Sequence, residues 1–177
     1  MQIKTPAEAL SPLAAIADAF DANLLDMDGA RKFWGQPDNH RPRREPDRVV
    51  LYTGLGGRIL LTLADAFTAR NALTYGMGIV PALKPLVEIS RAYDENCLDG
   101  PARKFRPRGD DASPMSAVVL LTNIVLVTDV NGMPILTLQD VTDGHISWLQ
   151  AREDARQLAA QLAREREATR TGLRDTA

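Results

Sequence analysis

The dipeptide Asn131-Gly132 lies between two runs rich in β-branched and other apolar residues, Ile124 to Val130 and Met133 to Val141. Both residues of the dipeptide adopt positive φ readily, and the two central positions of a type I′ turn require positive φ. The sequence therefore predicts a β-hairpin over residues 124–141, and any fold of this chain must bury one face of it.

A two-residue turn would fix the register of this hairpin. It would pair Val130 with Met133, Asp129 with Pro134, Val127 with Leu136 and Val125 with Leu138. Side chains alternate between the two faces of a strand, so the last two pairs are predicted to form the core face. Pro134 has no N–H to donate, which predicts an edge strand over Met133 to Gln139.

Two helices are predicted at the ends of the chain. The first begins at the capping box Thr5-Pro6-Ala7-Glu8 and ends near Gly29. Its apolar stripe, spaced by three and four residues, comprises Leu10, Leu13, Ala17, Phe20, Leu24 and Met27. The last helix is predicted from Gly144 to Ala168, with Thr142 or Asp143 as its cap. Its stripe has the same spacing and comprises Trp148, Ala151, Ala155, Leu158 and Leu162.

The middle of the chain reads as strand, glycine turn and helix. Val49 to Thr53 is the predicted strand, and Gly54-Leu55-Gly56-Gly57 is the turn. The helix that follows is indicated by Leu60, Leu63, Ala64 and Phe67, which would share one face. At the N-terminus of a helix such glycines could hold a phosphate, although a tight turn alone explains them. A further helix is predicted over Pro85 to Asn96.

Length and composition predict one domain. The chain has 177 residues, of which 45% are hydrophobic and 25% are charged, as in ordinary globular proteins. We expect a single globular domain over residues 1–168 and a flexible tail over 169–177. The expected fold is α+β, with four or five helices around a small, mainly antiparallel sheet built on the 124–141 hairpin, Val49 to Thr53 as a third strand, and a long C-terminal helix.

Charge and cysteine content exclude several classes. The net charge of −2 gives no overall field that would draw the chain onto nucleic acid or an anionic membrane. Cys97 is the single cysteine and His40 and His145 are the only histidines, so we expect no disulfide, no metal and no cofactor. The first residues lack an apolar signal-peptide core, and the longest apolar run, Ala117 to Val130, is too short and polar to span a bilayer. These features predict a cytoplasmic protein.

Two arginine-rich loops could bind phosphate groups if the fold brings them together. Their basic residues are Arg41, Arg43, Arg44, Arg103, Lys104, Arg106 and Arg108. Phe105 and Trp34 lie close to these residues in the sequence and could stack on bases. Acidic neighbours and prolines make ordinary solvent-exposed surface the alternative interpretation.

One motif resembles an enzyme family. Asp26-Met27-Asp28-Gly29 is similar to the first motif of the haloacid dehalogenase superfamily, and Val49 to Gly54 is similar to its second. The resemblance implies a nucleophilic aspartate, a general acid and a magnesium ion, with phosphate bound by Thr53. The family's first motif ends a buried strand, whereas here it continues a helical stripe, which would leave Asp26 and Asp28 in solvent.

No other catalytic constellation is indicated. Ser113 and Ser147 have no recognisable partner for nucleophilic catalysis, and His145 is expected to make a surface or capping contact. We therefore expect a non-catalytic protein that acts through protein–protein interaction or self-assembly. The expected docking surfaces are the hairpin edge and the helix stripe of Trp148, Ala151, Ala155, Leu158 and Leu162. A nucleic-acid-binding regulator is the alternative, and a phosphatase is a weaker one.

Overall fold

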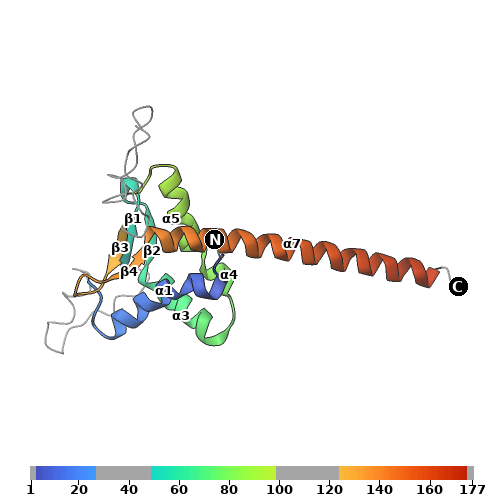
Figure 1. Cartoon of the computed structure of the whole chain (residues 1–177), viewed down its shortest axis with the longest axis horizontal. Coiled ribbons are helices and arrows are strands. Elements are labelled where there is room, and N and C mark those ends of the chain that lie inside the picture. The colour runs from blue at the N-terminus through green and yellow to red at the C-terminus, as the bar shows by residue number, and fades with distance from the viewer. Residues whose placement is uncertain (1–2, 27–48, 99–123, 175–177) are drawn as a thin grey trace.

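A computed structural model describes residues 3–26, 49–98 and 124–174 (Figure 1). The described elements are α1 (Pro6–Asp21), β1 (Val50–Thr53), the short 3-10 turn η2 (Leu55–Gly57), β2 (Ile59–Thr62), α3 (Leu63–Tyr75), α4 (Ile79–Ala82), α5 (Lys84–Asp94), β3 (Val125–Thr128), β4 (Pro134–Thr137) and α7 (Leu138–Arg174). The helices, the antiparallel pairing and the long terminal helix confirm the predicted α+β fold. The strands form two separate two-stranded sheets, β1–β2 and β3–β4, so Val50–Thr53 does not extend the predicted hairpin.

The first part of α7 is the centre of the globular body. It packs against α5 on one side and α1 on the other, and α1 packs in turn on α3 (Figure 1). The side chains that seal this body are completely or almost completely buried, and they include Leu10, Leu13, Ile16, Leu61, Leu63, Leu83, Leu86, Ile89, Leu136 and Leu138. Beyond the body, α7 continues alone as a long rod.

The N-terminal helix begins as predicted and ends earlier. The side chain of Thr5 accepts from the backbone N–H of Glu8, and the Glu8 carboxylate accepts from Thr5 N, so the capping box is confirmed. The prediction that the helix continues to Met27 is wrong, because α1 stops at Asp21 and Asn23 has a positive φ of 55°. The chain then turns back, and Leu24 is 45% exposed instead of lying on the stripe.

Residues 24–26 run alongside β3 in the antiparallel direction. Leu25 forms a bridge with Asp129, and Asp26 N donates to Thr128 O at 3.1 Å. Asp26 is exposed, as expected, but it follows an extended segment and not a helix. Asp28 and Gly29 lie outside the described residues.

The prediction of a helix directly after Gly57 is also wrong. Ile59–Thr62 is a strand that pairs antiparallel with β1, and the glycines form the loop of this hairpin, with positive φ at Gly56 and Gly57. The helix α3 begins later, at Leu63, where Thr62 and Asp65 form a second capping box. The loop is therefore not at a helix N-terminus, and the phosphate-binding interpretation of its glycines is withdrawn.

The β3–β4 hairpin is present, with a different turn. Gly132 has positive φ but Asn131 does not, and Asp129 N donates to Met133 O at 2.9 Å. This is a three-residue loop with a left-handed glycine. The Asp129 carboxylate favours it by accepting from the N–H groups of Asn131 and Met133.

The change of turn shifts the register. The predicted pair Val127 with Leu136 is confirmed, but Pro134 pairs with Thr128 and Val125 pairs with Thr137. Leu138 is buried as the first residue of α7, so the predicted edge strand over Met133 to Gln139 is shortened to Pro134–Thr137.

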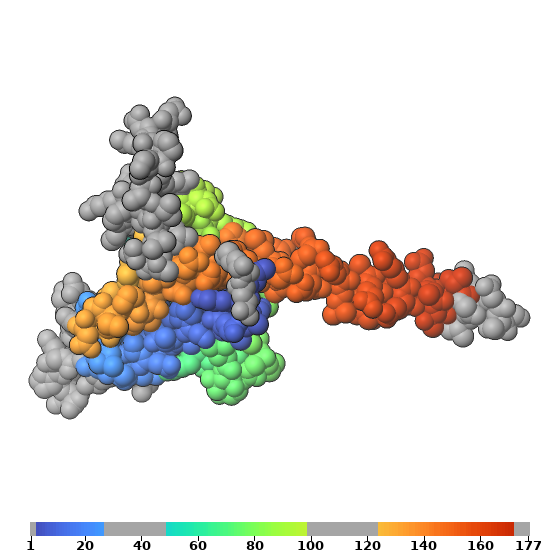
Figure 2. Space-filling view, viewed as in Figure 1, coloured from blue at the N-terminus to red at the C-terminus, as the bar shows by residue number. Residues whose placement is uncertain are grey.

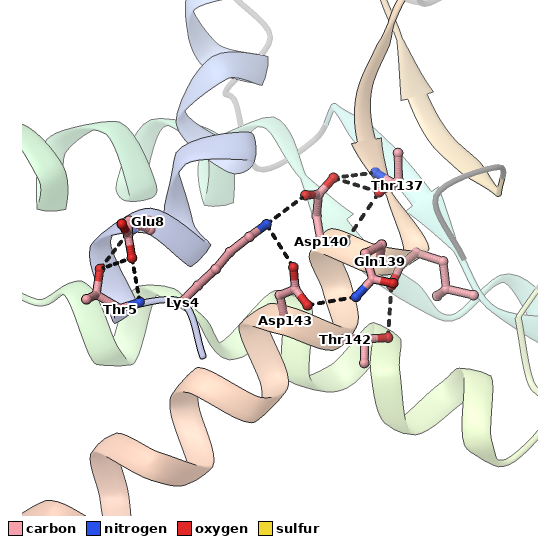
Figure 3. Close-up of polar contacts among 9 residues, drawn as sticks. Lys4, Thr5, Glu8, Thr137, Gln139, Asp140, Thr142 and Asp143 are labelled. Carbon is pink, nitrogen blue, oxygen red and sulfur yellow. Dashed lines mark hydrogen bonds and ion pairs between the residues drawn. The ribbon is translucent and has the colours of Figure 1, made fainter. Parts of the chain in front are cut away.

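The long helix begins six residues before its predicted start. Thr137 and Asp140 form a capping box, with Asp140 accepting from Thr137 N at 3.0 Å (Figure 3). Thr142 and Asp143, the predicted caps, lie inside α7. Lys4 reaches the helix from the N-terminal segment and pairs with Asp143 at 2.8 Å and with Asp140 at 3.5 Å. The hydrogen bond to Asp143 raises the pKa of the Lys4 ammonium. These contacts of Lys4 connect the segment before α1 to the first turns of α7.

Candidate interaction site on the C-terminal helix

The helix α7 has a packed half and an exposed half. Side chains from Leu138 to Ala151 are buried or half-buried along the face that meets α5 and α1. Every described side chain from Arg152 to Thr171 is exposed. We call the segment Arg152–Arg174 the arm, and at about 1.5 Å per residue it extends about 35 Å beyond the body (Figure 2).

The packed half crosses α5 at very close range. A Cβ on Gly144 would lie 2.4 Å from Leu86 Cδ1, a distance that Cβ atoms essentially never show, and 3.0 Å from Leu86 Cβ, which is tighter than most Cβ contacts. One turn further along α5, Ser90 Oγ lies 2.9 Å from His145 Nδ1. Ser90 is buried and His145 is half-buried, so His145 joins two helices and does not make the expected surface or capping contact. Sequence reasoning missed this pair because its members are far apart in the chain.

Trp148 marks the point where α7 leaves the body. Its indole ring is half-buried, with the Arg91 guanidinium 5.8 Å and the Arg152 guanidinium 4.6 Å from the ring centroid. Ala151 is half-buried as well. These two residues of the predicted stripe therefore already have contacts within the chain, and they anchor the arm.

The other three stripe residues lie on the arm. Leu158 is 57% exposed and Leu162 is 45% exposed, and Ala155 is exposed between them and the body. Spacings of three and four residues place them on the same side of the helix as Trp148 and Ala151. We call Ala155, Leu158 and Leu162 the arm stripe. The arm stripe lies on the same side of α7 as the residues that pack inside the body, but in the described residues nothing covers it.

Around the arm, polar side chains pair with one another along the helix. Gln150 donates to Asp154 at 2.8 Å, Gln157 to Glu153 at 3.2 Å and Gln161 to Glu165 at 3.0 Å. Pairs at this spacing stabilise an isolated helix by about 0.2–0.5 kcal/mol each. These paired polar side chains are therefore suited to water, while the arm stripe is not.

The basic residues predicted for nucleic-acid binding lie outside the described residues. This holds for Arg41, Arg43, Arg44, Arg103, Lys104, Arg106 and Arg108 alike. The nucleic-acid alternative therefore stays a prediction. It expects binding that weakens steeply with salt.

The described residues offer little support for phosphoryl transfer. The family's first motif ends a buried strand, whereas Asp26 follows the antiparallel bridge of Leu25 with Asp129, and the strands in the described ranges all pair antiparallel. A pocket between α3 and α5 contains Asp65, Lys84 and Glu88. Asp65 is engaged in the α3 capping box and Glu88 pairs with Arg58 at 2.8 Å, so both acids already serve the fold. Across the described part of the chain, no three His, Cys, Asp or Glu side chains are grouped to hold a metal ion.

No family model, curated protein or solved structure matches this chain. Of the helices that the structure describes, none is long and apolar enough to cross a membrane. The feature of the described chain that most needs a functional explanation is the uncovered arm stripe.

The Ser90–His145 contact predicts a pH dependence of stability. Burial lowers the pKa of the His145 imidazole below its ordinary value of 6.5, and Arg91 adds to this effect while Asp94 opposes it. Just below pH 6.5 the unfolded chain therefore binds more protons than the folded chain, so stability is full above that pH and falls as the pH is lowered through the folded-state pKa.

Urea unfolding followed by circular dichroism between pH 7.5 and 5 will measure this loss. The variant His145→Gln removes the titrating group and should show a flatter dependence than the parent protein. His40 lies outside the described residues, so the variant His40→Gln is the matched control, and it should keep the parent slope. Equal slopes for all three proteins would contradict the assignment to His145.

Proposed function

We propose that this is a non-catalytic cytoplasmic protein that acts by binding another protein chain through the arm stripe. The observation that carries the proposal is that α7 leaves the body with Leu158 and Leu162 exposed on the line that is buried further back. The single cysteine, Cys97, is a free thiol, in keeping with a reducing compartment.

The proposal rests on the balance of free energies along the arm. Burying one leucine side chain contributes about 1.5–3 kcal/mol, and here that contribution is not realised within the described part of the chain. A helix that lays regularly spaced apolar residues into a groove or onto another helix is a common mode of recognition. The arm has the length, the spacing and the paired polar side chains for this mode.

A photo-cross-linking experiment tests this function in the full chain. A photo-reactive amino acid is placed at Leu158, or at Gln157 on the opposite face as the matched control, in cells that make the protein. We expect a covalent protein adduct from position 158 at several times the yield from position 157. Introducing Leu162→Glu into the same chain should abolish the adduct, because a carboxylate in an apolar contact costs several kcal/mol.

Two results would refute the function. One is an absence of adducts at position 158, and the other is an equal yield from both positions. Leu158, Gln157 and Leu162 are all exposed on the arm, so these changes should leave the unfolding transition of the body intact, and circular dichroism can check that they do.

A further inference from the structure

We infer that the pocket between α3 and α5 binds a small organic molecule with one carboxylate group, and that the ammonium group of Lys84 holds this carboxylate. The inference concerns the globular body and does not depend on the arm stripe. The evidence is the apolar part of the pocket wall and the way in which each charged side chain of the pocket is engaged.

The pocket lies where β2, α3, α4 and α5 meet. Its volume is about 250 Å³, below the range of about 300–1,000 Å³ that is usual for sites of drug-sized ligands, so it suits a small molecule. One part of its wall is apolar and is formed by Leu60, Pro81, Ala82 and Pro85. Leu60 and Ala82 belong to the buried core, so this part of the wall is fixed by the packing of the body. A short alkyl chain placed against it would be removed from water.

The two acidic side chains of the pocket are already paired. Asp65 Oδ2 accepts from Thr62 N and from Thr62 Oγ1, each at 2.8 Å, at the N-terminus of α3, where the helix dipole also favours a negative charge. The two carboxylate oxygens of Glu88 face two arginines, Arg58 at 2.8 Å and Arg91 at 3.8 Å. Both negative charges are therefore compensated within the fold.

The basic side chain of the pocket, Lys84, is not paired in this way. Within the described residues its ammonium group forms no hydrogen bond and no ion pair. Thr68 offers the ligand no donor, because its hydroxyl donates to Ala64 O at 2.8 Å. The group available for recognition is thus one ammonium beside an apolar wall, and a carboxylate forms strong charge-assisted hydrogen bonds with an ammonium. One positive charge near two acids favours a ligand with a single negative charge over a dianion such as a phosphate monoester.

A titration of the full chain with valerate, a carboxylate on a straight alkyl chain, tests the site. We expect saturable shifts of the amide NMR signals of Leu60, Asp65 and Lys84, with a dissociation constant on the order of 1 mM for so small a ligand. Two compounds with the same alkyl chain isolate the head group. Pentanol and pentylammonium should each bind at least fivefold more weakly, because neither presents a negative charge to Lys84.

A charge variant tests the role of the ammonium group. Lys84→Gln should weaken the binding of valerate at least fivefold and leave the binding of pentanol within about twofold, because it removes the charge and keeps the apolar wall. The matched control is Arg164→Gln, which removes the same charge from the exposed arm. It should leave the affinity for valerate within about twofold of the parent.

A second pair of variants tests the place of binding. Thr68→Phe puts a large side chain at the rim of the pocket and should weaken the binding of valerate and pentanol alike, at least fivefold. Thr74→Phe is the control on the same helix. Thr74 is exposed like Thr68, does not line the pocket, and makes the same kind of bond, from its hydroxyl to Arg70 O at 2.9 Å. Its replacement should leave both affinities unchanged.

Three results would overturn the inference. They are an absence of saturable shifts at ten times the expected dissociation constant, an affinity for valerate that both Lys84→Gln and Thr68→Phe leave unchanged, and binding of pentylammonium as tight as that of valerate. The last result would assign recognition to Asp65 and Glu88 and not to Lys84. The amide spectrum of each variant also shows whether its body is folded. The photo-cross-link at Leu158 reports on the arm alone, so the inference and the proposed function are refuted by separate measurements.

Discussion

Replacing Gly144 with alanine is expected to destabilise the protein by about 1–3 kcal/mol, the usual cost of forcing an extra methyl group into a packed interior. The new Cβ would lie 2.4 Å from Leu86 Cδ1 and 3.0 Å from Leu86 Cβ, so the buried Leu86 side chain would have to change its conformation and α5 would have to shift away from α7 by a few tenths of an ångström. Helix propensity alone predicts the opposite sign, since alanine is favoured over glycine inside a helix by about 1 kcal/mol. Urea unfolding of the single variant decides between the two.

Two further variants make this test specific. Gln157→Ala, on the exposed arm, should change stability by less than about 0.5 kcal/mol, because it alters a helix surface without touching the body. In a Leu86→Ala background, Gly144→Ala should cost less than in the parent chain, because Leu86 Cδ1 and Cγ are gone and only the Cβ contact remains. An increase in stability on Gly144→Ala would show that the helices do not approach as closely as described.

Truncating Leu136 to alanine is expected to cost about 2–5 kcal/mol, the range for a large aliphatic side chain removed from a packed core. Leu136 has 0% exposure and lies opposite Val127 in the hairpin. Guanidinium unfolding monitored by circular dichroism measures this loss.

A matched pair of valines tests the register at the same time. Val127 is 5% exposed, whereas Val125 is half-buried, so Val127→Ala should cost clearly more than Val125→Ala. Equal costs would favour the two-residue turn, which places both valines on the core face. The comparison is useful because the two substitutions remove the same atoms.

Local signals predicted the start of the first helix and the presence of the second hairpin. Thr5 and Glu8 form the capping box that their spacing indicates, and Val127 pairs with Leu136. Two further capping boxes, Thr62 with Asp65 and Thr137 with Asp140, have the same spacing with aspartate in place of glutamate. They were missed because the residues before each box were assigned to a helix in one case and a longer strand in the other.

Other features depend on contacts that a local pattern does not contain. Ile59–Thr62 has only four residues, too few to separate the period of a strand from that of a helix. The end of α1 depends on Asn23 adopting a positive φ so that Leu25 can bridge to Asp129, more than one hundred residues away. The alternating spacing of the last helix did identify Trp148, Ala151, Ala155, Leu158 and Leu162 as one stripe. The point along it where the body ends is set by α5, which the stripe itself does not reveal.

Because α7 is one uninterrupted helix from Leu138 to Arg174, its buried beginning and its exposed end are rigidly connected. A partner chain that binds the far end of α7 is therefore held at a fixed distance and rotation from the globular body. Each residue inserted between the body and the leucines would rotate the leucines by about 100° and move them by about 1.5 Å along the helix. The length of this helix therefore sets both the distance and the rotation between the globular body and any chain that binds at the far end of α7.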